Sequence, residues 1–237
     1  MDKVDLKLDW CDFKTAKYAV EHWHYSHSMP TPPIVRIGVW ENAKYTGCVL
    51  FSRGSNNNLL KPFGLKQTEG CELTRIALKE HFSPVTRIVA IAIRMLLRES
   101  PELRLIVSYA DPNNNHNGAI YQAGNWLFSG QTSDDCYYVD KHGRRWHSRQ
   151  VSRTGVSRQY GEYRNVPKHE DCTEVPLLGK YRYLYPLDDA MRKQIEPLRK
   201  PYPKRADKAT QSATGDQPEN GGASPTYPLI EVRDSGS

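Results

Sequence analysis

The sequence is poor in cysteine. It has five cysteines among 237 residues, namely Cys11, Cys48, Cys71, Cys136 and Cys172. They are widely separated, without the close paired spacing of zinc sites, and their odd number argues against a complete disulfide framework. We therefore expect reduced thiols, as in a cytoplasmic protein.

Long apolar runs are also lacking. No stretch approaches the ~18 consecutive apolar residues of a membrane-spanning helix, and the first ten residues, MDKVDLKLDW, contain no apolar segment of the kind found in signal peptides. We expect a soluble cytoplasmic protein without a membrane partner. The length suits one domain, placed at residues 1–203. Residues 204–237 have few apolar side chains and predict a disordered tail.

Positive charge is concentrated in one segment. The net charge is +6, and residues 141–205 hold 16 Lys and Arg against 7 Asp and Glu, which is +9 and leaves −3 for the rest. Aromatic side chains alternate with these cations: Trp146, Tyr160, Tyr163, Tyr181, Tyr183 and Tyr185. This mixture suits contact with DNA phosphates and stacking on bases. The alternative is a basic surface that only aids solubility.

Hydrophobic periodicity and turn residues predict a mixture of helices and strands. The expected order begins with a helix from the Asp12 cap to about residue 22, a hairpin over 34–53, a strand over 71–80 and a helix capped by Ser83 with Pro84 first. A strand near 103–109, a short helix over 118–126 and a hairpin over 136–148 follow. A strand over 180–186 and a helix begun by Asp188 are expected last. This order predicts an α+β (α/β) fold with a mixed central sheet flanked by helices.

The most informative stretch is LRLIVSYADPNNNHNGAIYQAGNW, residues 103–126. An apolar run predicts a strand covered on both faces, and Asp111 follows its end within a loop of Pro and Asn residues. The carboxyl end of a central strand is a common position for an active site in α/β folds. The alternative is that Asp111 only caps a turn.

The order of elements resembles the GNAT superfamily of acyltransferases. The resemblance implies that the pyrophosphate of an acyl-CoA, such as acetyl-CoA or another acyl donor, rests on backbone amides at the start of the central helix. In this sequence that segment is Phe82, Ser83, Pro84 and Val85. Free amides and the helix dipole attract anions there. The glycine-rich turn typical of the superfamily is replaced by HFSPVTR.

Several blocks taken together resemble the Mom family of phage DNA-modification proteins. They are WHYSHSMP, FSRGSNNNLLKPFGL, CELTRIAL, SYADP with HNGAIYQAGNW, KYRYLYPLD and MRKQIEPLRKPYP, and they extend from about residue 23 to residue 203. The resemblance implies conversion of adenine in double-stranded DNA to N6-carbamoylmethyladenine. In the cytoplasm of the host cell this modification shields phage DNA from restriction.

Carried over block by block, the resemblance implies catalytic roles for His24, Tyr25, Arg75, Asp111 and Tyr121. Each has a structural alternative, since a His or Tyr in a loop is more often packed than catalytic. In GNAT enzymes a Tyr at the position of Tyr121 often acts as an acid; alternatively, its ring fills the core.

The implied chemistry sets further expectations. Adenine's exocyclic amine is a weak nucleophile, so Asp111 or His24 is expected to take its proton. Because the product joins nitrogen to the carbon beside the carbonyl, thioester aminolysis is not the whole reaction, and iron bound by His24, Tyr25 and Asp111 is a second expectation.

The base must also leave the helix stack, and three aromatic side chains are candidates to hold it: Trp23, Tyr25 and Trp126. DNA phosphates are expected to contact the following arginines: Arg53, Arg75, Arg144, Arg145, Arg149 and Arg153.

Two other functions fit the same residues. One is an ordinary GNAT acetyltransferase that acts on a protein or a small amine. The other is a DNA-binding anti-restriction protein without catalytic activity, for which neither Asp111 nor Tyr25 would be needed. The sequence leaves the donor, the target sequence and the oligomeric state open.

Overall fold

A computed structural model describes residues 4–54, 57–159 and 161–204. The chain forms two compact units. The first comprises Met1–Ser133 and Gly179–Arg205, and the second contains Asp134–Leu178. The second unit is therefore an insertion in the first. The single domain over 1–203 stays a prediction, and the predicted tail lies outside the described residues from 205 onward.

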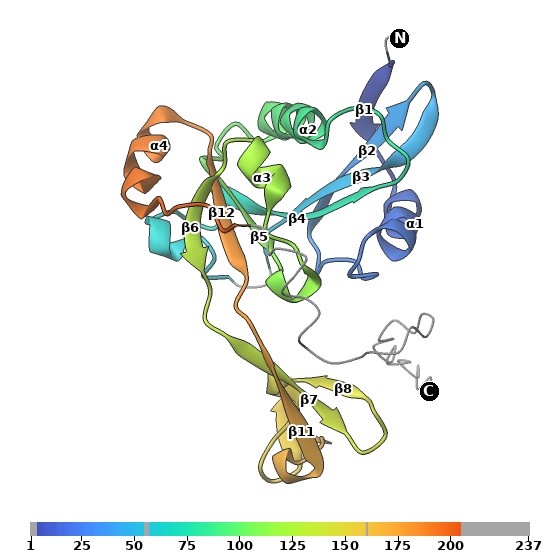
Figure 1. Ribbon diagram of the computed structural model, residues 1–237, viewed down its shortest axis with the longest axis vertical. Helices are drawn as coiled ribbons and strands as arrows, with labels where there is room; N and C mark the ends of the chain where they lie inside the picture. The colour runs from blue at the N-terminus through green and yellow to red at the C-terminus, as the bar shows by residue number, and fades with distance from the viewer. Residues whose placement is uncertain (1–3, 55–56, 160, 205–237) are drawn as a thin grey trace, which may run out of the picture. The chain divides into compact units, whose positions relative to one another are not determined.

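The first unit is built on a seven-stranded mixed sheet (Figure 1). Its order is β1 (Leu6–Trp10), β2 (Ile34–Glu41), β3 (Lys44–Ser52), β4 (Gly70–Leu78), β5 (Leu105–Ala110), β12 (Tyr181–Pro186) and β6 (Leu127–Gln131). Neighbours are antiparallel except β4 and β5, which are parallel. A mixed sheet flanked by helices was predicted, and the structure confirms it.

Helices cover both faces of this sheet. On β3, Val49 and Phe51 pack in one apolar cluster with α2 (Val85–Glu99), while Cys48 and Leu50 pack with α1 (Phe13–Trp23). Because alternate residues of a strand point to opposite faces, α1 and α2 lie on opposite sides. The short α3 (Ala119–Ala123) joins the α2 side, and α4 (Asp189–Ile195) packs on the other, with Leu105 and Val107.

Strands β4 and β5 part before their ends. They pair only from Gly70 opposite Leu105 to Leu73 opposite Ser108. Beyond that point β4 has a register shift against β3, and its remaining residues pair with β3 alone. A bulge bends its strand, so β4 turns away from β5. The parting opens the sheet at the carboxyl end of its two parallel strands.

The second unit has two small sheets of its own. One has the order β11 (Cys172–Leu177), β7 (Asp135–Asp140) and β8 (Arg145–His147), and the other is a hairpin of β9 (Val156–Gln159) and β10 (Glu162–Asn165). The hairpin predicted at 136–148 is confirmed as β7 and β8. Strands β9, β10 and β11 are short and largely polar, and neither they nor β1 were predicted.

Two sequence predictions about local structure were wrong. Helix α2 begins at Val85 with Pro84 as its cap, and no side chain caps it, so Ser83 is not the cap. Tyr183 was expected in a DNA-contacting basic segment, but it is fully buried in the core of the first unit, where its ring packs against Tyr121 and Phe128. No described helix is long and apolar enough to cross a membrane.

Candidate active site

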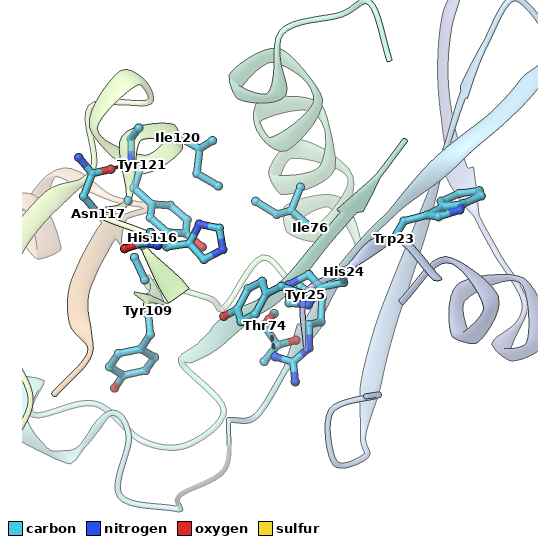
Figure 2. Close-up of a pocket in the computed structure, with 15 residues that line it drawn as sticks. Trp23, His24, Tyr25, Thr74, Ile76, Tyr109, His116, Asn117, Ile120 and Tyr121 are labelled. Atoms are coloured by element: carbon cyan, nitrogen blue, oxygen red, sulfur yellow. Dashed lines mark hydrogen bonds between the residues drawn. The ribbon is translucent and has the colours of Figure 1, made fainter. Parts of the chain in front are cut away.

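A cavity of about 540 Å³ lies where β4 and β5 part. Its walls come from the loop after α1, the end of β4, the end of β5, and the loop that leads into α3 (Figure 2). Four of the five predicted catalytic residues line it: His24, Tyr25, Arg75 and Tyr121. Segments distant in sequence therefore meet at one site, as the block resemblance implied.

The end of α1 delivers His24 and Tyr25 to this cavity. Helix α1 starts at the Asp12 cap, whose carboxylate accepts the Thr15 amide hydrogen at 2.9 Å, and ends as His24 adopts an extended backbone. The Tyr25 ring lies between two imidazoles, 4.4 Å from that of His24 and 4.7 Å from that of His116. These rings form an aromatic row on one side of the cavity.

The hydrogen bonds of His24 determine its tautomer. The backbone N–H of Ser26 donates to His24 Nδ1 at 3.1 Å, and the Ser26 hydroxyl lies 2.9 Å from the same atom. Nδ1 therefore carries the lone pair, and in the neutral ring the proton is on Nε2. Burial, with a smaller effect of the nearby Arg75, lowers the pKa of His24 to about 3. At neutral pH His24 is thus a hydrogen-bond donor through Nε2.

We expect His24 to reduce the stability of the fold in acid. Its folded pKa of about 3 lies below the ~6.5 of an unfolded histidine, so the unfolded state takes up a proton first as pH falls. The stability contributed by the neutral ring is complete above pH ~6.5 and is lost progressively as pH falls toward 3. At pH 4 the loss in the free energy of unfolding is on the order of 3 kcal/mol.

Urea unfolding between pH 7 and pH 4 measures this effect. The His24→Asn variant is the comparison, because its carboxamide oxygen can accept the Ser26 N–H and does not titrate. The stability difference between wild type and variant should shrink or reverse as pH falls. A difference that stays constant over this range would contradict the prediction.

Arg75 places a positive charge at the cavity without a carboxylate partner. Its Nε donates to the Ser28 carbonyl at 3.2 Å and its Nη1 to the Thr74 carbonyl at 2.7 Å. Among residues the structure describes, no carboxylate lies within ion-pair distance of this guanidinium. Arg75 therefore holds the loop after α1 against β4 and leaves its charge available to a bound group.

Tyr121 is buried at the cavity wall and hydrogen-bonded. Its hydroxyl lies 2.7 Å from Ser108 Oγ, which is also 2.7 Å from the Leu73 carbonyl. The single Ser108 hydroxyl proton must go to the carbonyl, so Tyr121 donates its proton to Ser108. Burial raises the pKa of Tyr121. Tyr121 thus remains neutral. Its hydroxyl proton is already donated to Ser108, at the point where β4 and β5 part.

Asp111 is next to the cavity but does not line it. One carboxylate oxygen accepts the Asn113 backbone and side-chain N–H groups at 3.0 and 2.9 Å, and the other accepts the Asn114 amide at 3.0 Å. The carboxylate also acts on Tyr25: burial raises the pKa of Tyr25, and Asp111 adds to the rise. Asp111 therefore caps the turn, and its negative charge also acts on Tyr25 at the cavity.

The predicted Asn-rich loop divides into two parts. Asn113 and Asn114 hold the Asp111 carboxylate, while Asn115, His116 and Asn117 line the cavity. His116 and Asn117 were not singled out from sequence, although their place directly after the turn would have indicated them. Trp126, predicted as a stacking residue, is only 2% exposed and lies outside this cavity, whereas Trp23 lines it.

The described residues do not fit the iron site. No group of three His, Cys, Asp or Glu side chains among them could hold a metal ion. Of the predicted ligands, His24 and Tyr25 line the cavity but Asp111 does not, and His24 uses its Nδ1 lone pair for Ser26. We therefore derive no chemical step through iron.

At the predicted CoA site, two backbone amides are already hydrogen-bonded to a carboxylate. Phe82 N–H and Ser83 N–H donate to the two carboxylate oxygens of Glu41, at 2.6 and 2.7 Å. The Phe82 side chain is 77% exposed, and Val85 is the first residue of α2. The sequence predicted the helix start one residue too early and did not indicate Glu41, which lies 41 residues before Phe82.

Of the arginines predicted to contact DNA, Arg75 is half-buried at the cavity, and the others have exposed side chains. Arg53 follows β3 in the first unit. The others lie in the second unit, on the segment that contains β8 and the residues after it: Arg144, Arg145, Arg149 and Arg153. Arg145 lies over the Tyr137 ring, 5.1 Å from its centroid. Their role in binding DNA stays a prediction.

Comparison with known proteins gives two kinds of match. An acetyltransferase of Salmonella typhimurium, solved with its cofactor acetyl-CoA, is 11% identical, with a TM-score of 0.41 over 78% of this chain and 95% of that one. An aminoglycoside acetyltransferase solved with coenzyme A is also 11% identical, with a TM-score of 0.42 over 81% of this chain and 98% of that one.

The sequence matches are more informative. The chain is 23% identical over 207 residues to the methylcarbamoylase Mom of Escherichia phage Mu, covering 84% of each protein. The model of the Mom protein family matches residues 5–204. This match includes nearly all described residues, both units and every element of the cavity, and the chain therefore belongs to the Mom protein family.

Proposed function

We propose that this protein is a transferase that converts adenine in double-stranded DNA to N6-carbamoylmethyladenine. The supporting observation is that four of the five residues implied by the Mom resemblance, on three separate segments, line one cavity that contains a positive charge and a row of aromatic rings. Such a product would protect phage DNA from host restriction.

The cavity suits a base that has left the DNA stack. Its volume falls within the ~300–1,000 Å³ of ligand pockets. Enzymes that modify a base in a duplex turn it out into a pocket and stack it on aromatic side chains. Tyr25 lines the cavity and is 46% exposed, so the exposed part of its ring is open to contact with adenine.

The polar groups suit transfer to an amine. The adenine nitrogen forms a bond to the methylene carbon of the carbamoylmethyl group, while the bond from this carbon to the donor breaks and its electron pair leaves with the donor. The amine proton goes to Asp111, which lies next to the cavity. Among the described residues its Oδ2 accepts only the Asn114 side-chain N–H and keeps a second lone pair, whereas the one lone pair of His24 Nδ1 already accepts the Ser26 N–H. His24 Nε2–H and Arg75 stabilise negative charge on the carbonyl oxygen or the leaving group.

Mass analysis of nucleosides tests this function. DNA from cells that express the protein is digested, and its adenosines are compared with those of cells that express the Arg75→Met variant. We expect a modified deoxyadenosine that has gained two carbons and one nitrogen. A product that gained two carbons without nitrogen would identify acetyl transfer instead, and unmodified adenine alone would refute the proposal.

Removal of the Tyr25 ring should weaken binding of the base. We expect Tyr25→Ala to reduce modification by the ~1–3 kcal/mol that stacking contributes per base, which is roughly 5- to 150-fold. Tyr25→Phe keeps the ring and should retain most activity. Modification is measured on plasmid DNA under single-turnover conditions. Equal losses in both variants would show that the hydroxyl, rather than stacking, is required.

The arginines of the second unit should control affinity for DNA rather than chemistry. Changing Arg144, Arg145, Arg149 and Arg153 to Ala should weaken duplex binding and reduce the slope of log affinity against log salt by about 0.9 for each lost phosphate contact. The control changes four exposed cations of the first unit to Ala: Lys7, Lys14, Arg94 and Arg98. Equal effects in both variants would indicate only a general loss of charge.

A further inference from the structure

We propose that the Glu41 carboxylate permanently occupies the anion position at the start of α2, so that the donor of the transferred group is not seated there by a CoA pyrophosphate. The inference concerns the donor of the reaction proposed above. Its tests measure binding without DNA, so they can fail or succeed independently of that function.

The geometry at the start of α2 is that of an occupied anion site. Glu41 is the last residue of β2, and its side chain is 3% exposed. Its two oxygens accept hydrogen bonds from the successive backbone N–H groups of Phe82 and Ser83. Among the described residues it forms no ion pair with Lys or Arg, so backbone amides are its main partners.

A phosphate placed before α2 would compete with Glu41 for the Phe82 and Ser83 N–H groups. Backbone N–H groups and the dipole at a helix start bind an anion because they carry partial positive charge. Here the Phe82 and Ser83 N–H groups are each already paired with one carboxylate oxygen of Glu41. A pyrophosphate placed at this point would have to displace a buried carboxylate or lie against its negative charge.

The charge of Glu41 persists at neutral pH. Burial alone would raise the pKa of this carboxyl, but the hydrogen bonds from Phe82 and Ser83 outweigh burial and hold the pKa below its ordinary value. Glu41 is therefore ionised under the conditions in which a CoA ester would have to bind.

The space beside the start of α2 is small. Between α2 and α3 it is lined by Thr86 and Val89 on one side and Ile120 and Tyr121 on the other, and it measures about 40 Å³. The cavity beside Arg75 is more than ten times larger. The larger cavity is therefore the one with room for a donor of the transferred group.

Calorimetric titration of the purified wild-type protein with coenzyme A and with acetyl-CoA is the first test. We expect no saturable heat at millimolar ligand. Saturable binding in the micromolar range would overturn the inference, whether or not the protein modifies DNA. Because this arm uses the unaltered chain, it does not depend on any variant folding.

Removal of the carboxylate is the second test. In Glu41→Ala the amides of Phe82 and Ser83 lose their partner, so inorganic pyrophosphate should raise the melting temperature of this variant and leave that of wild type unchanged. Glu41→Gln can accept only one of the two N–H groups and should show a smaller rise; it replaces Glu41→Ala if the latter does not fold.

Glu80→Ala is the matched control. Glu80 is exposed, lies two residues before Phe82 and pairs with Lys44 at 3.0 Å, so its loss removes the same charge without freeing the amides. Pyrophosphate should not stabilise this variant. Three results would show that Glu41 does not occupy the site. Pyrophosphate could stabilise the Glu80 and Glu41 variants equally, it could stabilise wild type, or it could leave both Glu41 variants unchanged.

Discussion

Replacing Asp111 with asparagine should lower DNA carbamoylmethylation by about 10²- to 10⁴-fold, the range typical for loss of a general base. Asparagine cannot take the amine proton at neutral pH. Its carboxamide oxygen can still accept the Asn113 backbone N–H, which Asp111 accepts at 3.0 Å. The loop should therefore keep its shape, and the melting temperature should change little.

Single-turnover modification of a duplex oligonucleotide measures this effect. Asn114→Ala is the control, because it removes one hydrogen-bond donor to the Asp111 carboxylate and keeps its charge. This control should retain most activity. If Asp111→Asn modified DNA at the wild-type rate, Asp111 would serve only to cap the turn, as the simpler interpretation of the sequence allows.

Loss of the Arg75 charge should have a similarly large effect. We expect Arg75→Met to slow modification by about 10²- to 10³-fold, as found when one donor to a developing negative charge is removed. Arg75→Lys keeps the charge but not the planar group that contacts both Ser28 and Thr74, so it should recover only part of the rate.

Arg36→Met provides a matched control for Arg75→Met. Arg36 is also half-buried on a strand of the same sheet, and it too donates to two backbone carbonyls, those of Cys11 and Ile34. It does not line the cavity. Both methionine variants should lose some stability, but only Arg75→Met should lose the chemical rate. Equal rates in the two variants would remove Arg75 from the mechanism.

The sequence predicted much of the first unit because its elements carry strong local signals. The Asp12 cap, the apolar stripe of α2 and the apolar run of β5 each act within a few residues. The start of α2 was misjudged because a Ser-Pro pair resembles a cap and first turn, whereas Ser83 here donates its backbone N–H to Glu41. In the second unit, β9 and β10 have four residues each and are mostly polar, so periodicity does not distinguish them from loops.

The site was predicted only in part, because its chemistry depends on contacts between distant segments. Family resemblance identified His24, Tyr25, Arg75 and Tyr121 as candidates, and the structure brings these four together. No local pattern could show that the Ser26 amide fixes the tautomer of His24, or that Ser108 takes the Tyr121 proton. Glu41 was missed for the same reason, since its partners are about forty residues away.

The insertion of the second unit has a consequence for how such a protein can diversify. The unit leaves the sheet after β6 and returns to it at β12, and these two strands are antiparallel neighbours. The Thr132 N–H donates to the Lys180 carbonyl at 2.9 Å, so the two ends of the insertion are already joined across one rung of the sheet. Inserted segments of different length and charge can be exchanged between Thr132 and Lys180 without changing the order of any strand around the cavity. The charged surface of the second unit can thus vary while the residues that line the cavity keep their positions.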